Sequence, residues 1–464
     1  SRSSEGTRPL TKAATALLKY SSSDQKRELA NRMMRQRVAR APLEPIRDPT
    51  AFEDAAIPES HYRLDLHPAY LNLLARMAEL EPPEIGGVPY FRFHQGLVRD
   101  TTRIGEREYI SFSNYNYLGL SGHPALKAAV AEALDRYGTS VSASRIVGGE
   151  RPIHIELEGA LAELLDTEAC LAFVSGHGTN VTTIAHLFGP KDLILHDKLV
   201  HNSIQMGALL SGARRIAFRH NDWQMLDDLL QRHRRHYERV VVILEGVYSM
   251  DGDFPDLPRF VELRERHKVF LMIDEAHSLG VLGARGRGIR EHFGLSGSDV
   301  DIWMGTLSKS LASCGGYIAG SRALILNLKF NAPGFVFSVG LSPANAAAAF
   351  AALQVMAAEP ERVAVLRQRA GLFLELARER QLPTGSSKGV SVVPLIVGDT
   401  KRCVALTNAL LKRGIDVQPI LYPGVRERAV RLRFFINGTH TEDQIGWTMG
   451  IVEEEWRRFG GRPV

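Results

Sequence analysis

The chain has 464 residues, of which 44% are hydrophobic and 23% charged, the balance of a globular protein large enough for one large domain and a smaller one. The formal net charge is +5, but residues 1–48 hold 11 Lys and Arg against 5 Asp and Glu, so the remainder is nearly neutral and has no nucleic-acid signature. The longest apolar run, 344–358, is shorter than the roughly 20 residues of a bilayer span and contains Asn345 and Gln354, so we expect no membrane span.

Three cysteines, Cys170, Cys314 and Cys403, have no metal-type spacing, and their odd number in a chain of this size argues against a disulfide framework. The sequence therefore predicts no metal site and a cytoplasmic location.

Residues 1–60 are predicted to form a basic extension. Within 24–40, apolar residues recur at helical spacing, and prolines follow at 42, 45 and 49, which indicates a short amphipathic helix and a linker. Three interpretations stay open: a targeting peptide, a docking segment or interdomain linker, and an arm that wraps the body. The acidic residues weaken the first, and we favour the linker or docking segment. Residues 61–105 are expected to form an N-terminal arm.

Short apolar runs alternate with helical patterns from about residue 105 to 345, which is typical of a mostly parallel sheet covered by helices. We therefore predict an α/β fold, with a large domain at 106–345 built on seven strands. The strand-like runs are CLAFVSG at 170, DLILHD at 192, RRIAF at 214, VVVILEG at 240, VFLMIDEAH at 269, DIWMGT at 301 and GGYIAG at 315.

Beyond Pro343, an Ala-rich helix and a second helical pattern at 363–380 precede strand-like VSVVPLIVG at 390 and RLRFFIN at 431. This composition indicates a smaller α+β domain over 346–464.

Polar residues at the ends of parallel strands are the first candidates for a functional site, because ligands collect there. Asp274 ends the apolar strand VFLMID, where a carboxylate needs a cationic partner such as a protonated pyridine nitrogen. Capping a helix or pairing with an arginine is the alternative. His277 follows by three residues and can reach the same ligand, although a lone histidine is more often structural.

Lys309 in GTLSKS follows a buried strand, and a lysine there can have its pKa lowered by desolvation, as Schiff-base chemistry requires. The alternative is an exposed loop lysine. The turn SGHGTN at 175–180 lies between a strand and a helix, where small residues let backbone N–H groups approach a phosphate. Alone, this turn is a weak signal.

Six motifs in this order resemble the α-oxoamine synthases, which include serine palmitoyltransferase and 8-amino-7-oxononanoate synthase. They are SNYNYLGLSGHP at 113, SGHGTN at 175, DKLVHNS at 197, EGVYSMDGD at 245, IDEAHSLGVLGARGRG at 273 and GTLSKS at 305. The resemblance covers about 105–450. It implies the fold type I of pyridoxal 5'-phosphate (PLP) transferases, a homodimer, and condensation of an amino acid with an acyl thioester with loss of carbon dioxide.

The resemblance also implies residue roles. The catalytic set would be Lys309, which carries PLP as a Schiff base and moves the substrate α-proton, Asp274 at the ring nitrogen, His277 at the ring hydroxyl, and His201 stacked on the ring. The implied cofactor-binding set is Ser175, Gly176, His177, Asn180, His201, Ser249, Asp274, His277, Thr306, Ser308, Lys309 and, from the neighbouring subunit, Ser338. Tyr115, Asn116 and Arg433 are the candidate substrate-binding residues.

The chain departs from the family pattern where an arginine usually grips the substrate carboxylate, since the aligned position is Leu421. Arg426, Arg431 or Arg433 can substitute, or can be structural. The segment LYPGVRERAVRLRFFINGTHTEDQI resembles synthase domains of polyketide-type assembly lines, so an acyl-carrier protein and acyl-CoA are both candidate donors. The rival hypotheses are another PLP reaction such as transamination, and a catalytically silent partner subunit, against which the retained Lys309 argues.

Overall fold

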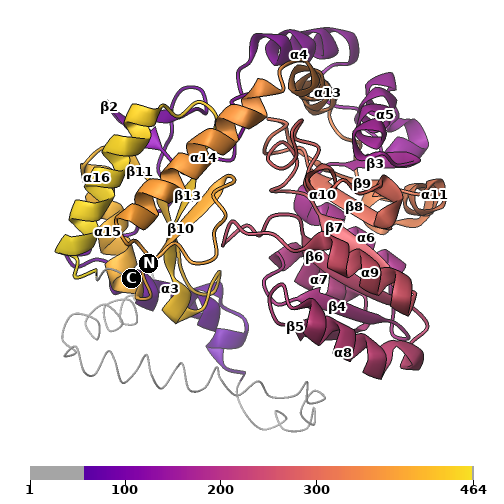
Figure 1. Cartoon of the computed structure of the whole chain (residues 1–464), viewed down its shortest axis with the longest axis horizontal. Coiled ribbons are helices and arrows are strands. Elements are labelled where there is room, and N and C mark those ends of the chain that lie inside the picture. Colours follow the sequence, from indigo (N-terminus) through magenta and orange to yellow (C-terminus); the bar gives the residue numbers. More distant parts are fainter. Residues whose placement is uncertain (1–56, 462–464) are drawn as a thin grey trace, which may run out of the picture. The chain divides into compact units, whose positions relative to one another are not determined.

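A computed structural model describes residues 57–461 of the chain (Figure 1). The chain divides into two compact units, one ending at Val88 and the other beginning at Pro89. The helix expected within 24–40 lies outside the described residues.

Within the described residues 57–88 of the first unit, two 3-10 turns precede one helix: η2 Glu59–His61, η3 Leu64–Leu66 and α3 Pro68–Ala78. Pro68 suits the first turn of α3, where a backbone N–H has no partner within the helix. The ring of His67 caps the helix by accepting a hydrogen bond from the backbone N–H of Ala69 at 3.1 Å.

The second unit is built on a seven-stranded sheet of order β3-β9-β8-β7-β6-β4-β5. β9 runs antiparallel to β3 and β8, and the other neighbouring pairs are parallel. This confirms the predicted α/β fold and the seven predicted strand runs. The strands are β3 Ala169–Phe173, β4 Leu193–Asp197, β5 Arg214–Phe218, β6 Val240–Glu245, β7 Phe270–Asp274, β8 Ile302–Thr306 and β9 Gly316–Gly320.

Alternate residues of each strand point to opposite faces of this sheet. Apolar side chains therefore lie on both faces, and helices cover both of them. In β6, Val240, Val242 and Leu244 enter one hydrophobic core, whereas Val241 and Ile243 enter the other. The first core receives side chains from α4 Pro124–Tyr137, α5 Pro152–Leu165, α8 Trp223–His233, α9 Leu257–His267 and α10 Ile289–Phe293. The second receives them from α6 Gly176–Leu187, α7 Asn202–Leu210, α11 Arg322–Asn331 and α12 Pro333–Val336. Short turns are η4 Arg145–Gly149, η5 Arg234–His236 and η6 Gly297–Asp299.

The C-terminal part holds two three-stranded sheets around a separate core. The first sheet is antiparallel, with order β10-β13-β12, and in the second β11 runs parallel to β2. The elements are β1 Thr101–Ile104, β2 Arg107–Ser111, β10 Val392–Ile396, β11 Ile415–Asp416, β12 Gln418–Ile420, β13 Arg431–Phe435, α14 Glu361–Glu379, α15 Thr400–Lys412, η7 Glu427–Ala429 and α16 Glu442–Arg458. Segments far apart in sequence thus share one small α+β part.

The long apolar run forms α13, Pro343–Ala358, whose Ser342 cap accepts a hydrogen bond from Asn345 N at 3.2 Å. Its buried alanines join the same core as α4 and α5. Within residues 57–461, no helix combines the length and the apolar character that crossing a membrane requires. The division at 61–105, 106–345 and 346–464 stays a prediction.

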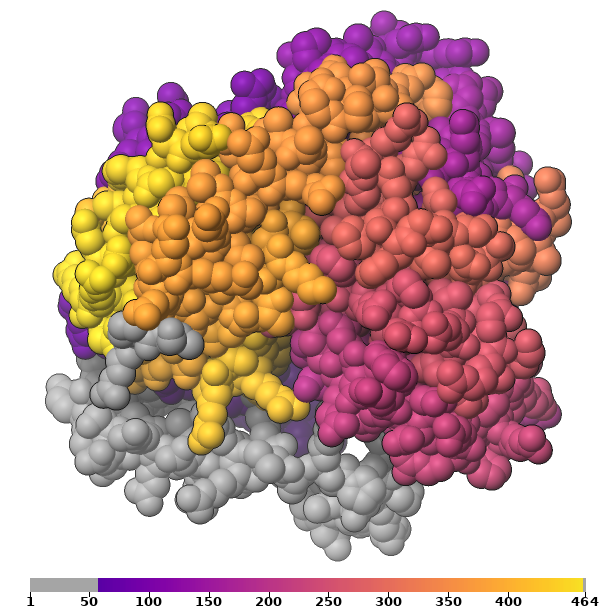
Figure 2. Space-filling view, viewed as in Figure 1, coloured from indigo at the N-terminus to yellow at the C-terminus, as the bar shows by residue number. Residues whose placement is uncertain are grey.

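The loop after β6, residues 246–254, contacts the small C-terminal part of the second unit. Figure 2 shows the orange C-terminal segments packed against the magenta segments of the large sheet. Gly252 has a φ of +71°, and a Cβ there would lie 1.9 Å from the carbonyl oxygen of Val392. The backbone N–H of Lys388 donates to the carbonyl oxygen of Gly252 at 3.1 Å. Glycine at position 252 permits this close approach, because any side chain would clash with Val392. The hydrogen bond from Lys388 then holds the loop against the C-terminal part.

Candidate active site

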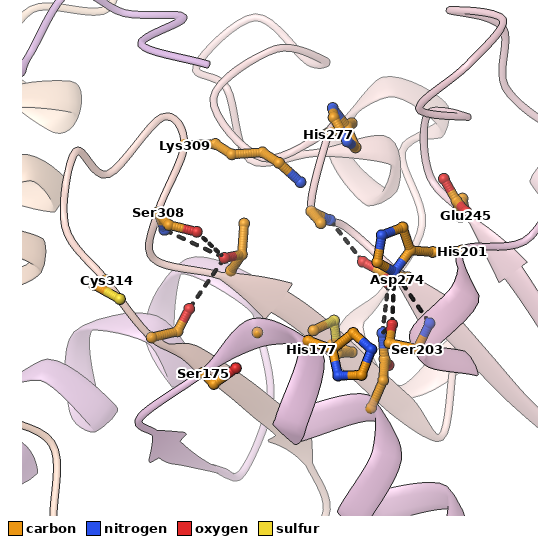
Figure 3. Close-up of a pocket in the computed structure, with 16 residues that line it drawn as sticks. Ser175, His177, His201, Ser203, Glu245, Asp274, His277, Ser308, Lys309 and Cys314 are labelled. Carbon is orange, nitrogen blue, oxygen red and sulfur yellow. Dashed lines mark hydrogen bonds between the residues drawn. The ribbon is translucent and has the colours of Figure 1, made fainter. Parts of the chain in front are cut away.

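A cavity of about 270 Å³ opens at the carboxyl ends of β6, β7 and β8 (Figure 3). It brings together most of the predicted cofactor residues, from loops that follow five different strands. The lining residues are Ser175, Gly176, His177, Asn180, His201, Ser203, Glu245, Asp274, Ala276, His277, Met304, Thr306, Ser308, Lys309, Cys314 and Gly315. The arrangement follows from the parallel sheet, whose strand ends meet at one edge.

Lys309 extends into this cavity from the loop after β8 (Figure 3). Burial lowers the pKa of its amine to about 8, against the opposing effect of the negative charges of Asp274 and Glu245. A neutral amine is therefore readily available near neutral pH, and the neutral form is the nucleophile that attacks a carbonyl carbon. The prediction that Lys309 lies at a buried strand end, and not on an exposed loop, is confirmed.

Asp274 ends β7 with its carboxylate buried. Its Oδ1 accepts a hydrogen bond from the backbone N–H of Ala276 at 2.9 Å, and its Oδ2 accepts one from Nδ2 of Asn180 at 2.8 Å. The same Asn180 amide donates to Ser203 Oγ at 2.9 Å. Two donors fix the carboxylate at the cavity wall, where it can face a cationic ring nitrogen.

Glu245 is a cavity residue that the sequence analysis did not single out. It ends β6 and is the register partner of Asp274 in β7. Burial and the negative charge of Asp274 raise the pKa of Glu245 to about 8, so its carboxyl group is protonated at neutral pH. The available signal was its place at the end of the strand run VVVILEG, the same position that drew attention to Asp274.

Two histidines border the cavity in their neutral forms. Burial, with the charges of Lys309 and Arg433, lowers the pKa of His277 well below its usual range, and His277 Nδ1 lies 2.7 Å from the hydroxyl of Tyr117. Burial also lowers the pKa of His201, whose Nδ1 lies 2.8 Å from Ser203 Oγ at the start of α7. Neutral imidazoles can stack on a ring or hydrogen-bond to it without adding charge.

The opposite end of the cavity is lined by small residues and hydroxyl groups. Ser175 caps α6, a 12-residue helix, and accepts a hydrogen bond from the backbone N–H of Gly178 at 3.1 Å. A Cβ on Gly176 would lie 2.9 Å from Thr306 Oγ1, so glycine keeps the start of the helix open. Thr306 Oγ1 lies 2.6 Å from Ser308 Oγ. A helix N-terminus beside two hydroxyl groups suits a phosphate.

Three predicted residues lie beside the cavity without lining it. The guanidinium of Arg433 donates from Nη1 to the carbonyl oxygen of Ser249 at 3.1 Å, and burial lowers its pKa. The backbone N–H of Ser249 donates to Glu245 Oε2 at 3.1 Å. The amine of Lys309 lies 5.6 Å from the ring centroid of Tyr115. Tyr115 thus lies close to Lys309, and Arg433 contacts the loop after β6 that carries Ser249.

Two other predicted residues are not brought into the cavity of this single chain. Asn116 is buried in a turn, where its Nδ2 donates to the carbonyl oxygen of Val98 at 2.7 Å and its Oδ1 accepts from Ser121 N at 3.1 Å. Ser338 borders a separate small space together with Arg145. The placement gives Asn116 a structural role, and Ser338 does not line the cavity of this chain.

The alternatives to the family arginine separate clearly. Arg431 is committed to Asp251, with Nη1 2.7 Å from Oδ1, and Arg426 is exposed at the start of η7. Leu421 packs at the edge of the C-terminal core. Of these residues, Arg433 is the one adjacent to the cavity, and its Nε has no hydrogen-bond partner within the described residues.

Comparisons with known proteins agree with this geometry. The family model for aminotransferase class I and II matches residues 107–446. The 8-amino-7-oxononanoate synthase of Geobacter sulfurreducens is 41% identical over 359 residues, 75% of this chain and 91% of that protein. That of Symbiobacterium thermophilum is 39% identical over 366 residues, 79% of this chain and 93% of that protein. A serine palmitoyltransferase from S. paucimobilis, solved with PLP and myriocin bound, has a TM-score of 0.81 at 27% identity, over 84% of this chain and 98% of that one.

The fold and the family match define a member of the aminotransferase class I and II family, with the fold type I of PLP-dependent transferases. Within that family the chain belongs to the α-oxoamine synthases, which are PLP-dependent acyltransferases.

The cavity fits this cofactor on its own chemistry. It presents a fixed carboxylate for a protonated ring nitrogen, an open helix N-terminus for a phosphate, and an amine of lowered pKa for an aldehyde. Asp274, Gly176 and Lys309 supply these three features from three separate strand ends, so one ligand can satisfy all of them at once.

Proposed function

We propose that the protein condenses an amino acid with an acyl thioester in this cavity. The proposed catalytic residues are Lys309, Asp274, His277 and His201. A bond forms between the amino acid α-carbon and the acyl carbon, while the bonds from the acyl carbon to sulfur and from the α-carbon to the carboxylate break. The products are an α-amino ketone, carbon dioxide and a free thiol. The observation that carries the proposal is the amine of Lys309, with its lowered pKa, in one cavity with the fixed carboxylate of Asp274.

The bound cofactor supplies an electron sink for the carbanion formed at the substrate α-carbon. Lys309 holds the cofactor covalently and then removes and returns the α-proton, for which a pKa of about 8 is well matched to neutral pH. Asp274 would hold the protonated ring nitrogen of the cofactor, and the neutral His277 would bind its ring hydroxyl group with Ser249. His201 would lie against the ring, and Gly176, His177 and Thr306 would hold the phosphate.

Arg433 is the proposed anchor for the amino acid carboxylate in place of an arginine at Leu421. It lies beside Ser249 and Tyr115, and its guanidinium carbon is 4.5 Å from the ring centroid of Phe435. Because Nη1 of Arg433 already donates to the carbonyl oxygen of Ser249, we expect weaker binding of the carboxylate than an arginine with both Nη atoms free would give.

The acyl donor is proposed to be an acyl-carrier protein, with acyl-CoA as the alternative, in a natural-product pathway of the polyketide type. The support is the resemblance of the segment from Leu421 to Ile445 to assembly-line synthases and the basic segment 1–48, since carrier proteins are typically acidic. The relatives point to a second candidate, formation of 8-amino-7-oxononanoate, the product in their names.

We further propose a homodimer in which Ser338 completes the phosphate site of the partner subunit. Apolar side chains are exposed around it, with Val147 at 84% and Phe337 at 86% exposure, and a second copy of the chain would cover them. A cytoplasmic location is proposed from the three free cysteines.

The test of the reaction is carbon dioxide release from an amino acid labelled in its carboxyl carbon. We expect release only when PLP and an acyl thioester are both present, and faster release with the acyl-carrier thioester than with the acyl-CoA. Release that does not depend on thioester would show a simple decarboxylase, and amino transfer to PLP without any release would show a transaminase.

A further inference from the structure

His220 lies partly buried between two carboxylates outside the cavity. Its Nδ1 lies 3.1 Å from Asp197 Oδ2 and its Nε2 lies 2.9 Å from Asp253 Oδ2. The side chains of His220, Asp197 and Asp253 are 15%, 0% and 6% exposed. Because an ionised carboxylate only accepts hydrogen bonds, two such contacts require a proton on both ring nitrogens. With both carboxylates ionised, the geometry holds a partly buried imidazolium cation.

The charges around the ring agree with that state. Burial lowers the pKa of His220. Its hydrogen bonds to Asp197 and Asp253 and their negative charges outweigh this effect and raise the pKa to about 10. The phenol ring of Tyr248 packs edge-on at 4.4 Å between ring centroids, and burial raises the pKa of Tyr248 far above its usual value. Asn221 Nδ2 lies 3.3 Å from His220 Nε2, and this pair is not a hydrogen bond when the ring is charged, because both atoms then carry protons. The ring thus faces two anions and neutral polar groups.

One arm of the cation fixes the loop after β4. Asp197 ends β4 and accepts hydrogen bonds from Leu199 N at 2.8 Å and from Asn221 N at 2.7 Å. Its carbonyl oxygen accepts from Val200 N at 3.3 Å. The next residue, His201, begins α7 and borders the cavity. The position of Asp197 therefore determines the position of the His201 backbone, and with it that of the His201 ring.

The other arm fixes the loop after β6. The carbonyl oxygen of Asp253 accepts a hydrogen bond from Tyr248 N at 2.8 Å, which closes the turn 248–253. The next residue after Tyr248 is Ser249, which contacts both Glu245 and Arg433. A shift of Asp253 would therefore move Ser249 and the guanidinium that depends on it.

We propose that His220 is a positioning residue of the active site, which holds the loop carrying His201 against the loop carrying Ser249. It touches neither the cavity nor the reacting atoms. The proposal rests on the assignment of the cavity to PLP. It adds a residue outside the cavity, His220, that holds two of the loops lining it. Loss of the cation would leave the cofactor in a looser site, with an ordered fold around it.

The test compares His220→Gln and Asp253→Asn with the wild-type holoenzyme. His220→Gln leaves two buried carboxylates without a cation, and Asp253→Asn keeps the cation but weakens one arm. The matched control is His267→Gln, which removes a histidine 2.6 Å from Asp227 between α8 and α9, away from the cavity. The readouts are the PLP dissociation constant, the visible circular dichroism of bound PLP across pH, and Tm.

We expect His220→Gln to raise the PLP dissociation constant by about tenfold or more and to lower kcat by up to roughly a hundredfold, since small misplacements near reacting groups are costly. In Asp253→Asn the pKa of His220 falls because one anion is lost, so the visible signal should be lost at a lower pH than in the wild type. His267→Gln should change Tm alone.

Three results separate the outcomes. If Asp253→Asn has the wild-type pH profile and PLP affinity while its Tm falls, His220 is merely structural and the inference is wrong, whether or not His220→Gln folds. The same holds if His267→Gln changes the PLP signal as much as Asp253→Asn does. If the wild-type protein itself takes up no PLP, the proposed function fails, and that result is distinct from either of the others.

Discussion

Glu245 and Asp274 are register partners at the carboxyl ends of β6 and β7, and both buried carboxyl groups line the same cavity. Two carboxyl groups so placed do not both ionise at neutral pH, because each would repel the other without water to screen them. Asp274 accepts hydrogen bonds from Ala276 and Asn180, whereas Glu245 accepts one from Ser249. Burial and the charge of Asp274 raise the pKa of Glu245 to about 8, so Glu245 is the group that holds a proton at neutral pH.

This assignment predicts the behaviour of Glu245→Gln. The pKa of Glu245 is raised from 4.5 to about 8 in the folded protein, so its contribution to stability is complete below 4.5 and is lost as pH rises through about 8. Glutamine does not ionise, so the Tm of the PLP-free variant should exceed that of the wild type by a margin that grows between about pH 5 and pH 9. A constant difference across this range would show that Glu245 does not titrate there.

Lys309→Ala should lower turnover by about 10³-fold or more, because the variant loses both the covalent attachment and the proton carrier. In the wild type, borohydride reduction followed by peptide mapping should place the cofactor on Lys309. Lys127→Ala on α4 is the control and should keep normal activity and labelling. Labelling of another lysine in the wild type would contradict the assignment.

Asp274→Asn should lower kcat by roughly a hundredfold or more, because a neutral amide no longer favours the protonated ring nitrogen. Its fold should persist with a lower Tm, because Ala276 N donates to Oδ1 and Asn180 Nδ2 to Oδ2, and the amide keeps an acceptor for only one of them. Asp192→Asn removes another buried carboxylate, one that accepts from Gly189 N at 2.8 Å, and should affect Tm without changing the cofactor spectrum. Retained full activity in Asp274→Asn would refute the role of Asp274.

Arg433→Lys should raise KM for the amino acid by roughly tenfold while kcat falls less, because an ammonium group cannot form a bidentate contact with a carboxylate. Arg426→Ala, at an exposed arginine, should leave KM unchanged. Steady-state kinetics with varied amino acid separates the two parameters. An effect on KM from Arg426→Ala equal to that of Arg433→Lys would place the carboxylate elsewhere.

The strand runs were predictable because the strands of the sheet are buried on both faces and read as continuous apolar segments, as VVVILE in β6 does. Asp274, which ends β7, was predictable for the same reason. Glu245 was overlooked because its signal was only its position, and His220 because its meaning depends on Asp197 and Asp253, which are far from it in sequence.

Two other features could not be read from the chain in order. The small C-terminal part recruits β1 and β2, which precede the large sheet by some 60 residues, and sequence patterns do not report such long-range pairing. The choice among Arg426, Arg431 and Arg433 also needed coordinates, because residues 426–433 hold four arginines that have the same composition signal and differ only in where they lie.

The most direct measurement is the mass of the product formed from a panel of amino acids and acyl thioesters by the PLP-loaded protein, followed together with thiol release. We predict a product whose mass equals the amino acid plus the acyl thioester minus carbon dioxide and the free thiol, formed with one thiol released per product. Spectral binding of amino acids without thiol release, or a product that retains the carboxylate, would contradict the condensation.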